Sequence, residues 1–396
     1  MTSEDKSAEI TVRQLYKIFQ ADDRVMGMVR EGKTKAEIQE ETGAVVAVSA
    51  AEFEVQEHEI FVIMGLSGSG KSTLLRCINR LIEPTSGEIH IGGEDILSLS
   101  DTELRRFRQD NMSMVFQHFG LLPHRTVIGN VEFGMELQGE PEGERKRRAR
   151  EAVEMVGLEG YEDSRVDQLS GGMQQRVGLA RALAPSTPIM LMDEAFSALD
   201  PLIRAEMHEE FLDLQRSHPR TIMFISHDLN ESLYLGDRIA IMKEGRIVRL
   251  GKPEEILVDP QVEYVEAFVE NVDRSKVVKA RTIMMEPDAT VRENTSIEDA
   301  RRALGEDRVL PVLDENERFL GLVTHGGLER AKRKSLRELI REDAVRAGPE
   351  QVLAELLIPS ADSNLPIVVL DQDEKLLGWI TRRMLLSGIQ GNRMIS

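Results

Sequence analysis

The stretch GLSGSGKST, from Gly65 to Thr73, decides the fold class of this chain. It matches G-x-x-x-x-G-K-[ST] in full, follows the apolar run IFVIM and precedes the helical pattern LLRCINRLI. Glycines let backbone N–H groups curl around phosphates. The pattern therefore predicts a phosphate-binding loop made of Gly65, Leu66, Ser67, Gly68, Ser69, Gly70, Lys71, Ser72 and Thr73. Lys71 is expected to reach the β- and γ-phosphates, and Ser72 to hold Mg²⁺.

Acidic and polar residues follow three further apolar strands. In PIMLMDEAFSALD, Asp193 closes the strand and is expected to bind Mg²⁺. The adjacent Glu194 is free of that duty and can orient or deprotonate a water that attacks the γ-phosphate. His227, at the end of TIMFISHDL, is a candidate for a γ-phosphate contact. Gln117, in MSMVFQHFG, is a candidate for contacts with Mg²⁺ and water.

A second glycine-rich segment, LSGGMQQR (169–176), opens an amphipathic run that stops at Pro185. Ser170, Gly171 and Gly172 would present free backbone N–H groups to an anion at a helix start. The segment contains no lysine that could hold a phosphate. The residues alone therefore predict a second anion site and leave open which anion it serves.

The order of patterns along the chain predicts an α/β protein with two domains. Strands and helices alternate from 65 to about 250, which favours a parallel sheet. We expect residues 1–270 to form a nucleotide-binding domain with a helical insertion at 21–46 and an inserted helical subdomain at about 101–175. Residues 276–396 contain two weak repeats, about 276–331 and 332–390, which are expected to stack and share one core.

Composition narrows the functional classes. The chain has 396 residues and a net charge of −19, which argues against a general nucleic-acid-binding protein. Its single cysteine, Cys77, excludes internal disulfides and fits a reducing compartment. No apolar run approaches the ~20 residues needed to cross a bilayer, so we expect a soluble or peripheral protein.

Taken in order, these motifs resemble the ATP-binding subunits of ABC transporters, over residues 10 to about 250. The resemblance implies a P-loop NTPase core and an ATPase reaction with ATP and Mg²⁺. It also implies that two subunits pair head to tail, each ATP lying between the phosphate loop of one subunit and the 169–176 segment of the other. Ser170, Gly171, Gly172, Gln174 and Asp200 would then serve the partner's nucleotide. On this reading the second anion site needs no lysine, because the lysine comes from across the interface.

Several features narrow the resemblance to the glycine betaine/proline betaine (quaternary ammonium) importer ATPases. They are the 21–46 insertion, the segments MDEAFSALDPLIR and GDRIAIMKEGRIV, and a C-terminal pair of CBS-like repeats. The resemblance implies a complex at the cytoplasmic face of the inner membrane, with two permease subunits and a solute-binding protein or domain. The aromatic residue that stacks on adenine would be Phe19, with Tyr16 as the alternative.

The CBS-like repeats carry the expected regulation. CBS modules that bind adenosine nucleotides often have an acid three residues after the last strand's Thr or Ser, but Gly327 and Met384 stand there. We therefore expect no AMP or ATP in this module and keep a cyclic dinucleotide, or dimerisation alone, as alternatives. The run RAKRKSLRE is either a solvated linker or a contact with anionic lipid that weakens as salt rises. Its basic residues are Arg330, Lys332, Arg333, Lys334 and Arg337.

Two other hypotheses for the function of the whole chain remain. One is the ATPase of another importer, for amino acids such as methionine or for polyamines, whose CBS-like tail only dimerises. The other is a non-transport ABC protein, which usually carries two cassettes or long coiled-coil insertions. The 21–46 insertion and the repeats favour the betaine class.

Overall fold

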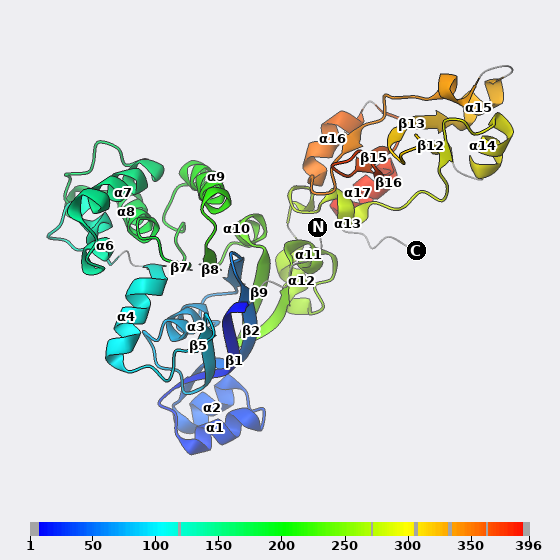
Figure 1. Ribbon diagram of the computed structural model, residues 1–396. Coiled ribbons are helices and arrows are strands. Elements are labelled where there is room, and N and C mark those ends of the chain that lie inside the picture. The colour runs from blue at the N-terminus through cyan, green and yellow to red at the C-terminus, as the bar shows by residue number, and fades with distance from the viewer. Residues whose placement is uncertain are drawn as a thin grey trace. The chain divides into compact units, whose positions relative to one another are not determined.

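The computed structural model describes residues 8–117, 120–270, 272–304, 308–331, 335–361 and 363–390. The chain divides into two compact units, Met1–Ile256 with Pro260–Phe268, and Leu257–Asp259 with Val269–Ser396. We call them the cassette and the C-terminal module, and each is described by itself (Figure 1). Among the described residues, no helix combines the length and the apolar character that a membrane span requires.

The cassette is built on a six-stranded sheet in the order β10-β9-β3-β8-β7-β6. All neighbouring strands run parallel except β10, which pairs antiparallel with β9. The apolar runs IFVIM and TIMFIS are buried along their whole length, as expected for strands covered on both faces. The strands are β3 (Ile60–Met64), β6 (Met112–Val115), β7 (Ile189–Asp193), β8 (Thr221–Ser226), β9 (Arg238–Lys243) and β10 (Arg246–Gly251).

A second, four-stranded sheet has the order β2-β1-β4-β5. Its long pair, β1 (Ala8–Phe19) and β2 (Val45–Gln56), is antiparallel and brings Phe19 opposite Val45. The 21–46 insertion is therefore the connection between two paired strand ends. It contains α1 (Asp23–Arg30) and α2 (Lys35–Thr42), and the shorter strands are β4 (Ser86–Ile91) and β5 (Glu94–Asp95).

The insertion is a small folded element with its own apolar cluster. Asp22 caps α1, and a reciprocal Thr34–Glu37 capping box starts α2. Ile38 is the buried residue of α2. It packs among apolar residues of both helices and both strand ends, Ile18, Val25, Met28, Val29, Ala44 and Val46. This shared cluster fixes α2 against the two strands.

The remaining cassette helices cover the central sheet or form a group beside it. Figure 1 shows α6, α7 and α8 together, away from α1 and α2. The predicted helical subdomain contains one strand, because β6 leaves it to become the edge of the central sheet. The helices are α3 (Lys71–Ile78), α4 (Asp101–Asn111), α5 (Val127–Val131), α6 (Phe133–Leu137), α7 (Glu142–Met155), α8 (Gly171–Leu183), α9 (Pro201–Ser217), α10 (Leu229–Leu235), α11 (Pro253–Val258) and α12 (Glu263–Val269).

The C-terminal module repeats one topology twice. Each repeat has a three-stranded sheet, β11-β12-β13 and β14-β15-β16, in which the first pair is parallel and the second antiparallel. One apolar cluster joins residues of both repeats, including Phe319, Leu322 and Val368. The elements are α13 (Ala280–Ile283), β11 (Val291–Arg292), α14 (Ile297–Leu304), β12 (Val309–Leu313), β13 (Phe319–Thr324), α15 (His325–Arg330), β14 (Arg346–Ala347), α16 (Leu353–Ala361), β15 (Ile367–Leu370), β16 (Leu376–Ile380) and α17 (Arg382–Gln390).

Candidate functional site

The phosphate loop joins β3 to α3 and leaves no room for a side chain at Gly70. That residue has φ +103°, and a Cβ there would lie 2.1 Å from the carbonyl oxygen of Ala47 on β2. The loop is held from another side by Gly245, whose N–H donates to the Ser69 carbonyl over 2.8 Å. The curvature that the glycine-rich sequence predicts is thus enforced by close backbone approach from β2 and from the turn between β9 and β10.

Lys71, the first residue of α3, is buried beneath this loop. Its ammonium donates to the carbonyl oxygens of Gly65 (2.8 Å) and Leu66 (3.2 Å). Burial lowers the pKa of Lys71, and the nearby carboxylates of Glu194 and Asp193 oppose that shift. The cation is therefore poised between its own loop and the acids at the end of β7.

Asp193 is fully buried at the tip of β7 and already has two partners. Its Oδ1 accepts from the Ser72 hydroxyl at 2.8 Å, and its Oδ2 lies 3.1 Å from an Arg76 guanidinium nitrogen. Two hard oxygens, one from the phosphate loop and one from the end of β7, thus converge on one point. Such donors suit Mg²⁺. Arg76, on α3, was not singled out from the sequence, and it supplies the countercharge for Asp193.

Glu194 connects the ends of three strands. Its Oε2 accepts a hydrogen bond from the Gln117 side chain at 3.2 Å and lies 3.5 Å from His227 Nδ1. Its backbone has φ +52°, a costly conformation for a non-glycine residue. The Gln175 amide, which donates to the Glu194 carbonyl at 3.1 Å, helps to hold it there. Sequence analysis missed Gln175, which looks like one more polar residue of an amphipathic helix.

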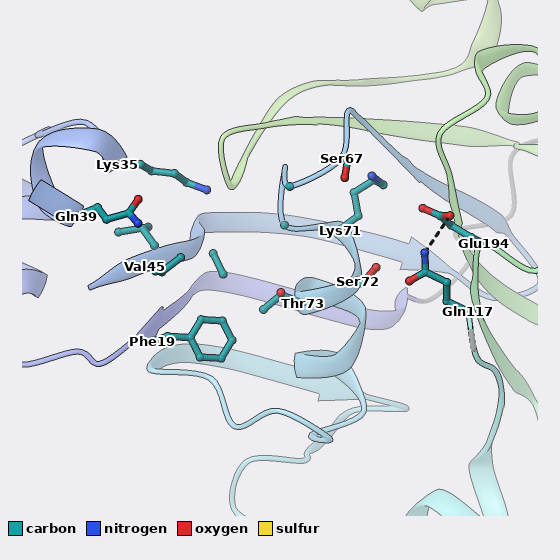
Figure 2. A pocket seen from close by; sticks show the side chains of 14 residues that line it. Phe19, Lys35, Gln39, Val45, Ser67, Lys71, Ser72, Thr73, Gln117 and Glu194 are labelled. Carbon is teal, nitrogen blue, oxygen red and sulfur yellow. Dashed lines mark hydrogen bonds between the residues drawn. The ribbon is translucent and has the colours of Figure 1, made fainter. Parts of the chain in front are cut away.

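Several of these residues, Lys71, Ser72, Gln117 and Glu194 among them, border one cavity of about 480 Å³ (Figure 2). The cavity extends from Phe19, at the end of β1, past the phosphate loop to Gln117 and Glu194. Of the residues predicted for the phosphate loop and the strand ends, Gly65, Leu66, Ser69, Asp193 and His227 do not line it. The full lining is Phe19, Lys35, Gln39, Val45, Val46, Ala47, Ser67, Gly68, Gly70, Lys71, Ser72, Thr73, Gln117 and Glu194. Lys35 and Gln39 come from the insertion and were not predicted, because the pairing of Phe19 with Val45 that brings the insertion to the cavity is set by the tertiary structure.

The 169–176 segment does not border this cavity. The Ser170 hydroxyl accepts from the Met173 N–H at 3.3 Å and so caps its own helix, α8. The Gln174 amide nitrogen donates to two carbonyls of the preceding turn, at 3.1 and 3.2 Å. Asp200 caps α9 through the Ile203 N–H at 3.2 Å. Within one subunit these predicted nucleotide contacts therefore serve local structure.

The basic run of the C-terminal module is only partly described. Lys332, Arg333 and Lys334 lie outside the described residues. Arg330 ends α15, and Arg337 is 3.5 Å from the Glu293 carboxylate. At the two positions after the last strands, Thr324 and Thr381 cap their helices by accepting from the N–H groups of Gly327 and Met384.

Known proteins share this architecture. The ABC transporter family profile matches residues 48–197, and the CBS domain profile matches residues 280–333. A solved dimer of the ATP-binding cassette MJ0796, in a post-hydrolysis state bound to ADP and Pi, superposes with a TM-score of 0.54. It is 32% identical in sequence and aligns with 62% of this chain and 98% of its own length.

Curated relatives extend the match to almost the whole chain. The glycine betaine transport ATP-binding protein OpuAA of Bacillus subtilis is 47% identical over 99% of this chain and 95% of its own. The glycine betaine/carnitine transport ATP-binding protein GbuA of Listeria monocytogenes is 46% identical over 98% and 99%. The glycine betaine/proline betaine transport system protein ProV of Escherichia coli is 45% identical over 96% and 97%.

The fold and the phosphate loop define an ATP-hydrolysing cassette of the ABC type. Within that class, the chain belongs to the ATP-binding subunits of the glycine betaine/proline betaine transporter family, with a CBS domain in its C-terminal module.

Proposed function

We propose that this chain hydrolyses ATP to drive import of a quaternary ammonium compatible solute of the betaine class. The observation that supports this most directly is that Lys71 and Glu194 line one cavity, with Asp193 hydrogen-bonded to Ser72 beside it. The chain also resembles betaine-transport relatives over almost its full length. The cassette supplies the chemistry common to all ABC ATPases. The solute is assigned from the relatives' names, because the solute site itself would lie in partner chains.

The proposed division of labour follows from charge and position. Lys71 neutralises charge on the β- and γ-phosphates once its loop carbonyls are exchanged for phosphate oxygens. Glu194 orients the attacking water and accepts its proton, with Gln117 and His227 both next to its Oε2. His227 is largely exposed and can turn toward a γ-phosphate.

Mg²⁺ fits the oxygens of Ser72 and Asp193, which already lie 2.8 Å apart. Gln117 would add an amide oxygen from the end of β6. When bound, the ion supplies Lewis-acid polarisation of the phosphate oxygens. Arg76 would keep its hold on the second oxygen of Asp193 and so orient that carboxylate toward the ion.

We further propose that two copies pair head to tail, so that Ser170, Gly171 and Gly172 of one copy face the γ-phosphate held by the other. Support comes from the exposed α8 N-terminus, which has no phosphate site of its own, and from the dimeric state of the structural relative. Gln174 and Asp200 would support that surface through the local hydrogen bonds that they make.

The expected assembly includes two permease subunits and a solute-binding protein or domain, with this chain peripheral at the cytoplasmic face of the membrane. Reconstitution tests the proposal. The purified complex in vesicles should show ATPase activity that rises when glycine betaine or proline betaine is supplied on the side of the membrane that carries the solute-binding protein or domain. Stimulation by methionine or a polyamine, and by no quaternary amine, would contradict the betaine assignment and favour the other importer class.

Regulation by salt rests on the basic run of the C-terminal module. If Arg330, Lys332, Arg333, Lys334 and Arg337 contact anionic lipid, each contributes up to ~1 kcal/mol, and the contact weakens as the screening length shrinks. Lys332, Arg333 and Lys334 changed together to Gln should lower the salt concentration at which transport in anionic vesicles begins. If the salt concentration at which transport begins does not change, the module would serve dimerisation or bind a cyclic dinucleotide instead. A direct titration with a cyclic dinucleotide would distinguish these two roles.

A further inference from the structure

The helical insertion places a cation and an amide at the nucleotide cavity. Lys35 and Gln39 both belong to α2 and both line the cavity that contains the phosphate loop. They are four residues apart, so they project from the same face of the helix. Figure 2 shows the Lys35 side chain extending from α2 toward the phosphate loop, with Gln39 beside Val45.

The position of α2 follows from strand pairing. Phe19 and Val45 are register partners at the ends of β1 and β2, and both line the cavity. The insertion leaves one of these strand ends and returns to the other, and its buried Ile38 packs against Val46. Lys35 lies about one turn before Ile38, and Gln39 directly follows it. When Ile38 packs into the cluster, both of these side chains therefore face the cavity.

The ammonium of Lys35 lies against the turn that supports the phosphate loop. A Cβ built on Gly245 would meet Lys35 Nζ at 2.9 Å and the Ala47 carbonyl oxygen at 2.7 Å. Gly245 itself donates to the Ser69 carbonyl of the phosphate loop. One glycine therefore separates the Lys35 cation from the loop, and its φ of +80° is a second reason for glycine there.

Both side chains are free to take a ligand. Over the described ranges, neither the Lys35 ammonium nor the Gln39 amide makes a hydrogen bond or salt bridge. Lys35 is half-buried, and burial lowers its pKa while the nearby Glu244 carboxylate opposes that shift. By contrast, Lys33, two residues earlier, pairs with Glu41 at 2.7 Å and does not line this cavity. A partly desolvated cation without a hydrogen-bonding partner gains most from an anionic ligand.

We propose that the insertion forms one wall of the nucleotide site, with Lys35 binding the α-phosphate and Gln39 binding the nucleoside. This inference rests on the proposed nucleotide site and adds residues to it. In Figure 2, Ser67, Lys71 and Ser72 lie between Gln117 and Glu194 on one side and α2 on the other. A nucleotide with its adenine on Phe19 would therefore pass α2 between its base and its β-phosphate. The 21–46 insertion would thereby sense whether nucleotide is present.

The test compares adenosine, AMP and ADP binding to the full chain by calorimetry. Lys35→Gln should weaken AMP and ADP binding about tenfold, the loss of one charge-assisted hydrogen bond, and change adenosine binding by less than about twofold. Lys35→Arg should keep most of the affinity. Gln39→Ala should weaken all three ligands by a similar, smaller factor. Lys33→Gln is the matched control on the same insertion and should bind like the native chain.

The outcomes separate this inference from the site on which it rests. If Lys71→Ala weakens ADP binding but Lys35→Gln does not, the proposed contact of Lys35 with the α-phosphate is overturned. The proposed nucleotide site at the phosphate loop is then retained. If neither variant changes ADP binding, the nucleotide site as a whole is misplaced. Equal weakening of adenosine, AMP and ADP by Lys35→Gln would show a structural effect and would also overturn the phosphate contact. Amide exchange in α2 gives an independent readout, because bound ADP should slow it in the native chain and not in Lys35→Gln.

Discussion

Two glycine-rich helix N-termini in the cassette differ in their surroundings. At the start of α3, the backbone is enclosed by β2 and the Gly245 turn, with Lys71 and Asp193 within reach. At the start of α8, a Cβ on Gly171 would meet nothing within 4 Å. Similar local sequences thus give one enclosed anion site and one open surface. The difference shows that a glycine-rich helix start supplies only backbone N–H groups. The charged side chains around it come from the tertiary structure.

The largest expected effect comes from Glu194, the acid that lines the cavity beside the phosphate loop. Glu194→Gln should retain ATP binding and lose turnover by ~10²–10⁴-fold, as expected when a positioned general base is removed. Steady-state hydrolysis and equilibrium binding of ATP, measured on the same preparation, check this. Hydrolysis at the native rate would assign the base to another residue.

A second pair of variants tests the contrast directly. Lys71→Ala should weaken ATP binding by about ten- to a hundredfold, because a charge-assisted contact with phosphate is lost. Ser170→Arg should leave ATP binding to a single subunit unchanged and block the dimer, since it adds bulk and charge to the open surface. Binding isotherms and sedimentation of the ATP-bound chain measure the two effects.

Mixed dimers sharpen that prediction. When Lys71→Ala and Ser170→Arg subunits are combined, the defects should fall on defined composite sites if the sites are shared between copies. A purified monomer that turns over ATP as fast as the complex would contradict the shared arrangement.

The glycines themselves should respond differently. Gly70→Ala forces a Cβ to 2.1 Å from the Ala47 carbonyl at a positive φ, so nucleotide affinity should fall by about tenfold as the loop distorts. Gly171→Ala adds a methyl group in open space and should bind nucleotide normally as a monomer. Equal affinities for both variants would mean that the loop geometry does not control binding.

The smallest effect concerns the cap of α8. Ser170→Ala removes the acceptor for the Met173 N–H and should lower the free energy of unfolding by about 1 kcal/mol. Chemical denaturation of the full chain measures this, and Ser170→Thr should recover most of the loss. A larger loss for the threonine variant would indicate that the site cannot accept a methyl group.

Much of the candidate nucleotide site follows from local sequence patterns. A phosphate loop, and an acid directly after an apolar strand, are contiguous patterns that parallel sheets place at one edge. Glu194, Gln117 and His227 follow three different strands, and the structure brings their side chains together. Lys35 was not found, because a lysine in a charged helical stretch is usually a solvated residue.

By itself, the sequence determined the fold class, the phosphate loop, the strand-end residues and the repeat in the C-terminal module, since each is encoded by neighbouring residues. Only the tertiary structure decided which glycines are enclosed, that Arg76 pairs with Asp193, and that the insertion reaches the nucleotide cavity. Those contacts join residues from 23 positions apart, as for Gly70 and Ala47, to 210 positions apart, as for Lys35 and Gly245. They depend on the register of β1 with β2 and on the turn between β9 and β10, which local patterns do not specify.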